Sequence, residues 1–97
     1  MTKDDVQLLL KENKEYINNH FKVIEIGFFG SYAKNTFNEE SDVDILVEFE
    51  CGAKDFFNYM HLKEYLENLF NKKVDLVTKS GIKNQLKDKI VLEAIYA

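Results

Sequence analysis

The chain has 97 residues and a formal net charge of −4, with 45% hydrophobic and 31% charged residues. We expect one domain over residues 1–97, because a chain of this length supports a single modest core. The acidic balance disfavours a dedicated nucleic-acid binder, which usually presents a basic face. No apolar run approaches the length of a membrane span, and the first residues carry no signal-peptide pattern.

The cysteine and arginine content limits how the chain can form disulfides and bind phosphate. Cys51 is the single cysteine, so no disulfide can form within the chain, and a reducing, cytoplasmic location is expected. All 13 basic residues are lysine. Because arginine is the usual planar clamp for phosphate, any phosphate bound here has to be held by lysine, backbone amides, hydroxyls or metal.

Four stretches of the sequence carry helix signals. Apolar residues at helical spacing predict helices over about 2–19, 55–70 and from 84 onward, and Ser31 at a possible N-cap predicts a short helix over 31–34. The residues expected on the buried side of the 55–70 helix are Phe56, Phe57, Met60, Leu66, Leu69 and Phe70. The residues expected to recur along the last helix are Leu86, Ile90, Val91, Ala94 and Ile95.

Three stretches are rich in β-branched and aromatic residues and predict strands over 23–29, 43–49 and 74–77. Helices and strands therefore alternate along the chain. The expected fold is α/β (an α+β two-layer arrangement), with a short three-stranded mixed sheet and helices on one face.

Two aspartates lie two residues apart where the second strand begins, in Asp42-Val43-Asp44-Ile45. Residues i and i+2 of a strand point to the same side, so Asp42 and Asp44 are expected to share a face opposite Val43 and Ile45. Aspartate is disfavoured in strands, which favours a cation site. The alternative is that Asp42 ends a turn while Asp44 faces water.

Asp75 is a third carboxylate, placed inside the four-residue apolar stretch 74–77. It joins Asp42 and Asp44 if its strand lies beside theirs; otherwise it faces solvent on an edge strand. Three converging carboxylates raise one another's pKa, whereas Mg²⁺, which prefers oxygen ligands, makes the same cluster favourable. Two such ions can clamp an in-line phosphoryl displacement.

Gly30 and Ser31 follow the first strand. A glycine at a strand-to-helix junction lets the backbone approach a ligand, and the amides of the following helix start suit phosphate. The alternative is a turn glycine followed by an N-cap serine. Together with the aspartates, the pair favours a site for a metal-bound nucleotide.

Three segments, Gly30–Lys34, Ser41–Val47 and Leu92–Tyr96, resemble the polymerase-β-like nucleotidyltransferases, in particular the minimal nucleotidyltransferase (MNT) subgroup. The resemblance covers nearly the whole chain and implies the nucleotidyltransferase fold. Two departures stand out: Lys34 and Asn35 replace the arginine and glycine that the family often has. Neither removes a metal ligand, and Asn tolerates the left-handed backbone better than most residues.

The resemblance implies a role for each residue of the motif. Asp42 and Asp44 bind two Mg²⁺ ions together with ATP, and Asp75 binds the catalytic ion and helps to deprotonate the acceptor hydroxyl. Gly30 and Ser31 hold the β- and γ-phosphates. Such proteins are often antitoxins that neutralise a HEPN-domain ribonuclease toxin by moving AMP onto one of its tyrosines.

Two other functions remain open at this point. In the first, the chain would be a non-catalytic antitoxin that neutralises its toxin by binding alone. In the second, it would be a small-molecule nucleotidyltransferase whose acceptor pocket comes from a partner subunit. The leading hypothesis predicts a nucleoside triphosphate and a HEPN toxin as partners, with no membrane and no direct nucleic-acid partner.

Overall fold

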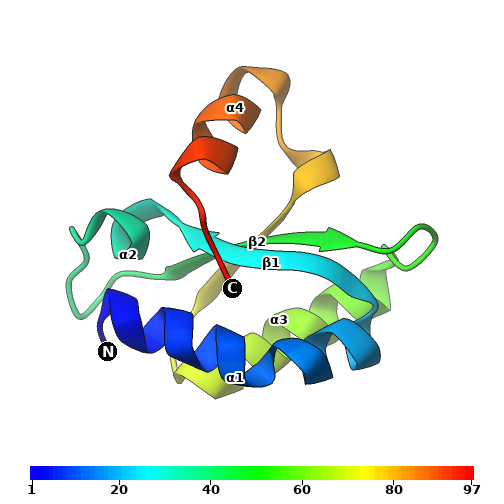
Figure 1. Cartoon of the computed structure of the whole chain (residues 1–97), viewed down its shortest axis with the longest axis horizontal. Coiled ribbons are helices and arrows are strands. Elements are labelled where there is room, and N and C mark those ends of the chain that lie inside the picture. Colours follow the sequence, from blue (N-terminus) through cyan, green and yellow to red (C-terminus); the bar gives the residue numbers. More distant parts are fainter.

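A computed structural model describes residues Met1–Ala97 and alternates helices with strands along the chain (Figure 1). The helices are α1 (Lys3–Phe21), α2 (Gly30–Lys34), α3 (Phe56–Phe70) and α4 (Asn84–Glu93), with a 3₁₀ turn η1 (Lys79–Gly81) before α4. The strands are β1 (Val23–Phe29), β2 (Val43–Phe49), β3 (Val74–Thr78) and β4 (Ile95–Tyr96). No helix has the length and apolar character that a membrane crossing requires.

The four strands form one mixed sheet in the order β3-β2-β1-β4. β2 runs antiparallel to β1 and parallel to β3, and α3 is the crossover between the two parallel strands. The expected α/β fold and mixed sheet are confirmed, but the expected number of three strands is wrong. The additional strand, β4, pairs antiparallel with β1.

The sequence pattern predicts that the residues of β4 belong to the end of the last helix. That helix stops at Glu93, and Ala94 has an extended backbone (φ −67°, ψ 142°). Ile95 then enters the sheet, and the Ala97 amide donates to the Ile26 carbonyl at 3.0 Å. A Cβ on Gly27 would lie 2.7 Å from the Ile95 carbonyl oxygen, so the glycine is what lets β4 approach β1.

One face of the sheet is covered by α1 and α3, whereas α4 lies on the other side (Figure 1). The expectation of helices on one face therefore holds for the two long helices only. α1 begins with a capping box, in which the Thr2 hydroxyl accepts from the Asp5 amide and the Asp5 carboxylate accepts from the Thr2 amide. This bond to the backbone lowers the pKa of Asp5.

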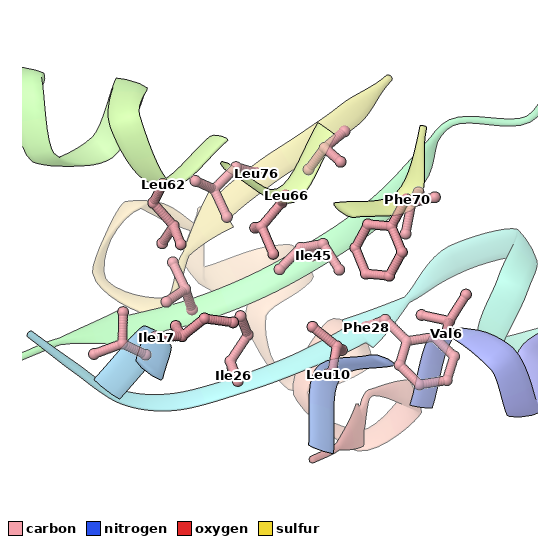
Figure 2. Close-up of a cluster of buried hydrophobic side chains, with 14 of the residues drawn as sticks. Val6, Leu10, Ile17, Ile26, Phe28, Ile45, Leu62, Leu66, Phe70 and Leu76 are labelled. Atoms are coloured by element: carbon pink, nitrogen blue, oxygen red, sulfur yellow. The ribbon is translucent and has the colours of Figure 1, made fainter. Parts of the chain in front are cut away.

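The hydrophobic core lies between the sheet and the two long helices (Figure 2). Val43, Ile45 and Val47 of β2 are fully buried and point into it, because alternate residues of a strand share a face. Residues from α1 and α3 pack against them, among them Val6, Leu10, Ile17, Leu62, Leu66 and Phe70. Because of this alternation, Asp44 and Glu48 of β2 point to the opposite face of the sheet.

The buried side of α3 differs from the expected one. Leu66 and Phe70 are buried as predicted, but Phe56, Phe57 and Met60 are 70%, 71% and 40% exposed. The hydrophobic character of these three side chains does not show which side of the helix is buried, because the buried stripe of α3 runs through Leu62, Leu66 and Phe70. At 3.6 residues per turn, Phe57 and Met60 fall on the opposite side of the helix. Leu86 of α4 is likewise 51% exposed, and α4 has no buried residue.

Candidate active site

Two of the predicted carboxylates are direct neighbours in the sheet. Asp44 of β2 and Asp75 of β3 are paired in the parallel register, on the face opposite α1 and α3. Asp42 precedes β2 by one residue, and its charge also acts on Asp44. Asp75 and Asp42 therefore both lie near enough to Asp44 for their charges to act on it, and the catalytic and metal-binding roles expected of the three residues stay predictions.

The proximity of the three carboxylates is visible in the pKa of Asp44, which is raised from 3.8 to about 6. Partial burial is the largest cause, followed by the charges of Asp75 and Asp42 and a side-chain hydrogen bond with Asp75. Burial and like charges both disfavour the ionised form of an acid. The fold thus holds the carboxylates close together although their charges repel one another, and a bound cation would reduce this repulsion.

Gly30 packs directly against this cluster. Its φ of +70° lies in the left-handed region, and a Cβ placed on it would lie 2.1 Å from Oδ2 of Asp44. The backbone conformation and the contact both require glycine. The sequence predicts that Gly30 lies at a ligand site. In the structure Gly30 directly follows β1 and lies against the carboxylate of Asp44 on β2.

Ser31 lies in the first turn of α2 and is partly exposed, next to Gly30. The C-cap of α2 is Asn35, whose φ of 62° is left-handed. The Thr36 amide donates to the Ser31 carbonyl at 2.9 Å. Asparagine therefore keeps the turn that a glycine would make, as expected from its tolerance of this conformation. Lys34 forms an ion pair with Glu93 of α4, with 3.4 Å between Nζ and Oε2.

The three aspartates do not form a metal site made by protein side chains alone, because no group of three or more His, Cys, Asp or Glu side chains is arranged so that it could hold a metal ion. Mg²⁺ is usually held by one or two carboxylates together with substrate phosphates and water, rather than by a cage made wholly of protein. Asp44, flanked by Asp75 and Asp42, fits a metal ion that arrives with a nucleotide.

Tyr59 of α3 is the residue at this site that the sequence did not single out. Its hydroxyl donates to the Leu76 carbonyl on β3, next in sequence to Asp75. Burial and the charge of Asp75 raise the pKa of Tyr59. No local signal marks Tyr59, because its place depends on how α3 lies along β3.

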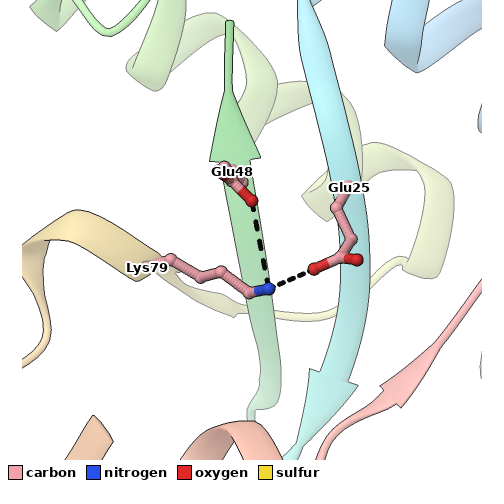
Figure 3. A network of polar contacts seen from close by, with 3 residues as sticks. All are labelled: Glu25, Glu48 and Lys79. Atoms are coloured by element: carbon pink, nitrogen blue, oxygen red, sulfur yellow. Dashed lines mark hydrogen bonds and ion pairs between the residues drawn. The ribbon is translucent and has the colours of Figure 1, made fainter.

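Two further residues with polar side chains have structural contacts. Tyr32 of α2 is 1% exposed and stacks on Phe37 with 4.3 Å between ring centroids. Lys79 of η1 forms ion pairs with Glu25 and Glu48 (Figure 3). The hydrogen bond to Glu25 is the main cause of its raised pKa.

A left-handed glycine turn packed against Asp44, which is paired with Asp75 on the neighbouring strand, is the arrangement expected of a nucleotidyltransferase within this fold. The chain belongs to the nucleotidyltransferase domain family, which matches residues 9–97.

Individual relatives agree with this assignment. The chain is 38% identical over 96 residues to the protein adenylyltransferase MntA of Thermococcus cleftensis, covering 99% of this chain and 96% of that protein. A solved structure assigned to the minimal nucleotidyltransferases superposes with a TM-score of 0.84 at 29% identity, covering 98% and 95% of the two chains. A toxin–antitoxin structure with AMP-PNP gives a TM-score of 0.70 at 25% identity, covering 99% of this chain and 72% of that one.

Proposed function

We propose that this chain is an Mg²⁺-dependent protein adenylyltransferase that moves AMP from ATP to a hydroxyl of a HEPN ribonuclease toxin, most simply a tyrosine, and so acts as its antitoxin. The observation that carries the proposal is the convergence of Asp42, Asp44 and Asp75 beside Gly30. Carboxylates crowded until the pKa of one rises are suited to a metal-bound polyphosphate.

Each residue of the cluster has a role in the proposed reaction. Asp42 and Asp44 would hold two Mg²⁺ ions together with the nucleotide, and Asp75 would hold the catalytic ion. Bound metal supplies Lewis-acid stabilisation of the charge that develops on the phosphoryl oxygens. Gly30 and Ser31 lie beside Asp44 and hold the β- and γ-phosphates.

The chemistry is an in-line displacement at the α-phosphorus of ATP. The acceptor oxygen forms a bond to the α-phosphorus while the bond to the bridging oxygen of pyrophosphate breaks, and pyrophosphate leaves. Asp75 is exposed on the edge strand β3 and takes the proton of the acceptor hydroxyl. An exposed base suits an acceptor that is delivered by another molecule.

The relatives support the protein substrate and the nucleotide. MntA of Thermococcus cleftensis is a protein adenylyltransferase of nearly the same length, and the solved toxin–antitoxin with AMP-PNP pairs this fold with an ATP analogue. The HEPN partner and the tyrosine acceptor rest on the family resemblance of the Gly-Ser and Asp-x-Asp segments.

The experiment uses ATP labelled on the α-phosphate, Mg²⁺ and, as the acceptor, a HEPN-domain protein that is toxic when expressed without this chain. We expect label on a tyrosine of the HEPN protein, no label when EDTA replaces Mg²⁺, and no label with Asp42→Ala or Asp44→Ala. If no label transfers while both variants still silence the toxin, the chain neutralises by binding alone and the catalytic proposal is wrong.

A further inference from the structure

The first turn of α3 carries an exposed apolar surface that the fold does not use. It consists of Phe56, Phe57 and Met60, which are 70%, 71% and 40% exposed, and we refer to it as the aromatic ledge. The two phenylalanine rings meet edge to face with 5.7 Å between centroids. Aromatic residues and methionine are enriched in protein interfaces, and side chains of this size gathered on one turn mark a binding surface.

A cavity of about 370 Å³ lies between the ledge and the free edge of the sheet. Its apolar walls come from Phe56 and Tyr59 of α3 and from Leu76 and Val77 of β3. Leu76 directly follows Asp75, and its carbonyl accepts the Tyr59 hydroxyl. The cavity is therefore lined by the residue that follows Asp75 and by one residue of the ledge, Phe56.

The distance along β3 between the cavity and Asp75 is short on the scale of a protein interface. Thr78, which lines the cavity, is three residues from Asp75 along β3, or about 10 Å at the rise of a strand. A standard interface covers about 800 Å² on each partner, a patch roughly 30 Å across. A protein that presents a hydroxyl at Asp75 can therefore reach around the β3 edge to the cavity and to Phe56, the ledge residue that lines it.

The direction of approach is limited on the other side of the cluster. Gly30 and α2 flank Asp44 there, which is where the nucleotide phosphates lie in the proposed function. β3, by contrast, is an edge strand, with Asp75 exposed. The β3 edge thus offers a free approach to Asp75 that passes the cavity and Phe56.

We propose that the aromatic ledge and the adjoining cavity are the docking surface for the acceptor protein of the AMP transfer, an inference that rests on the proposed function. The partner places an apolar side chain in the cavity and carries its acceptor hydroxyl about 10 Å away, within one interface. Asp75 is exposed, and Asp55 lines the cavity together with Lys54, so a basic residue of the partner near its acceptor would meet Asp55 and Asp75.

The test compares the double variant Phe56→Ser/Phe57→Ser with wild type and with Leu8→Ser. Leu8 is 55% exposed on α1, which covers the same face of the sheet as α3 but packs over β1 and not over the β3 edge. AMP transfer to the HEPN protein is measured over a range of HEPN concentrations, and AMP-PNP binding with Mg²⁺ is measured by calorimetry. A second variant, Met60→Ser, probes the ledge without altering the two phenylalanines.

We expect the double variant to raise the KM for the HEPN protein at least tenfold while the affinity for AMP-PNP stays within twofold of wild type. Met60→Ser gives a smaller increase in the same direction, and Leu8→Ser gives none. An unchanged KM in both ledge variants overturns the inference and leaves the proposed function standing.

Two further outcomes separate the possible failures. A wild-type chain that is a dimer in solution, and that the ledge substitutions convert to monomer without changing the KM, assigns the ledge to self-association and overturns the inference. A wild-type chain that transfers no AMP removes the proposed function, and the acceptor surface with it.

Discussion

The two faces of strand β2 have opposite characters. Toward α1 and α3, Val43, Ile45 and Val47 are completely buried in the core. On the other face Asp44 meets Asp75 and Glu48 meets Lys79, although Leu46 between them is also buried. Because successive residues of a strand alternate in direction, one short strand supplies both the core and the acidic cluster. Fold and function should therefore be separable by substituting adjacent residues.

The largest effect is expected on the acidic face, from Asp44→Asn. Loss of this carboxylate removes a proposed metal ligand worth several kcal/mol in the transition state, which corresponds to a decrease in AMP transfer of at least about 10³-fold. The metal-free variant should be no less stable than wild type, because Asp44 is repelled by Asp75 and Asp42. Label transfer and urea unfolding in EDTA measure the two effects. A variant that keeps more than a tenth of wild-type transfer contradicts the role of Asp44.

The next effect is expected on the core face, one residue along, from Ile45→Ala. Ile45 is fully buried, and truncating such a side chain costs about 2–5 kcal/mol of unfolding free energy. Activity per folded molecule should remain near that of wild type, since the side chain points away from the carboxylates. Thermal unfolding, combined with activity assayed well below the midpoint, tests this. A loss of activity without a loss of stability would mean that the two faces are not independent.

A smaller effect on stability is expected from Gly30→Ala, with Gly52→Ala as its matched control. Both glycines have positive φ (70° and 82°), so each substitution should cost about 1–2 kcal/mol in backbone strain. At Gly30 the new Cβ also displaces the Asp44 carboxylate, whereas nothing lies within 4 Å at Gly52. We expect transfer to fall more than tenfold in the first variant only. Equal activity in both would show that the contact with Asp44 is unimportant.

The smallest effect is a pH dependence of stability in the metal-free protein. The pKa of Asp44 is about 6 in the folded chain, above its ordinary 3.8, so the folded state binds more protons between these values and stability falls as pH rises through this window. With allowance for solvent screening, the loss is about 1–2 kcal/mol. Comparing wild type with Asp44→Asn in EDTA at pH 4.5 and 7.5 isolates this contribution. A stability difference that does not change with pH contradicts it.

The parts of the fold that the sequence predicts well depend on local pattern. β2 has the expected bounds, Val43–Phe49, because alternation and β-branched residues are local signals. The sequence predicts that Asp75 joins Asp42 and Asp44 if its strand lies beside theirs, and the structure pairs Asp44 with Asp75 in the parallel register of β2 and β3.

The parts that were missed depend on contacts between distant segments. β4 forms because Gly27 leaves room for Ile95, a relation that no window around Ile95 contains. Phe57 was expected in the core, because its hydrophobicity does not reveal which side of α3 faces the sheet. Tyr59 gains its place beside Asp75 only from the crossover geometry.

The most direct test of the central claim is calorimetric binding of AMP-PNP to the purified chain, which needs no acceptor. The claim is that the carboxylates on the open face, and not the neighbouring core residues, bind a nucleotide together with metal. We expect binding to wild type and to Ile45→Ala that requires Mg²⁺, and binding at least tenfold weaker to Asp44→Asn. Binding of equal strength to Asp44→Asn and wild type, or binding to wild type that is unaffected by EDTA, would contradict it.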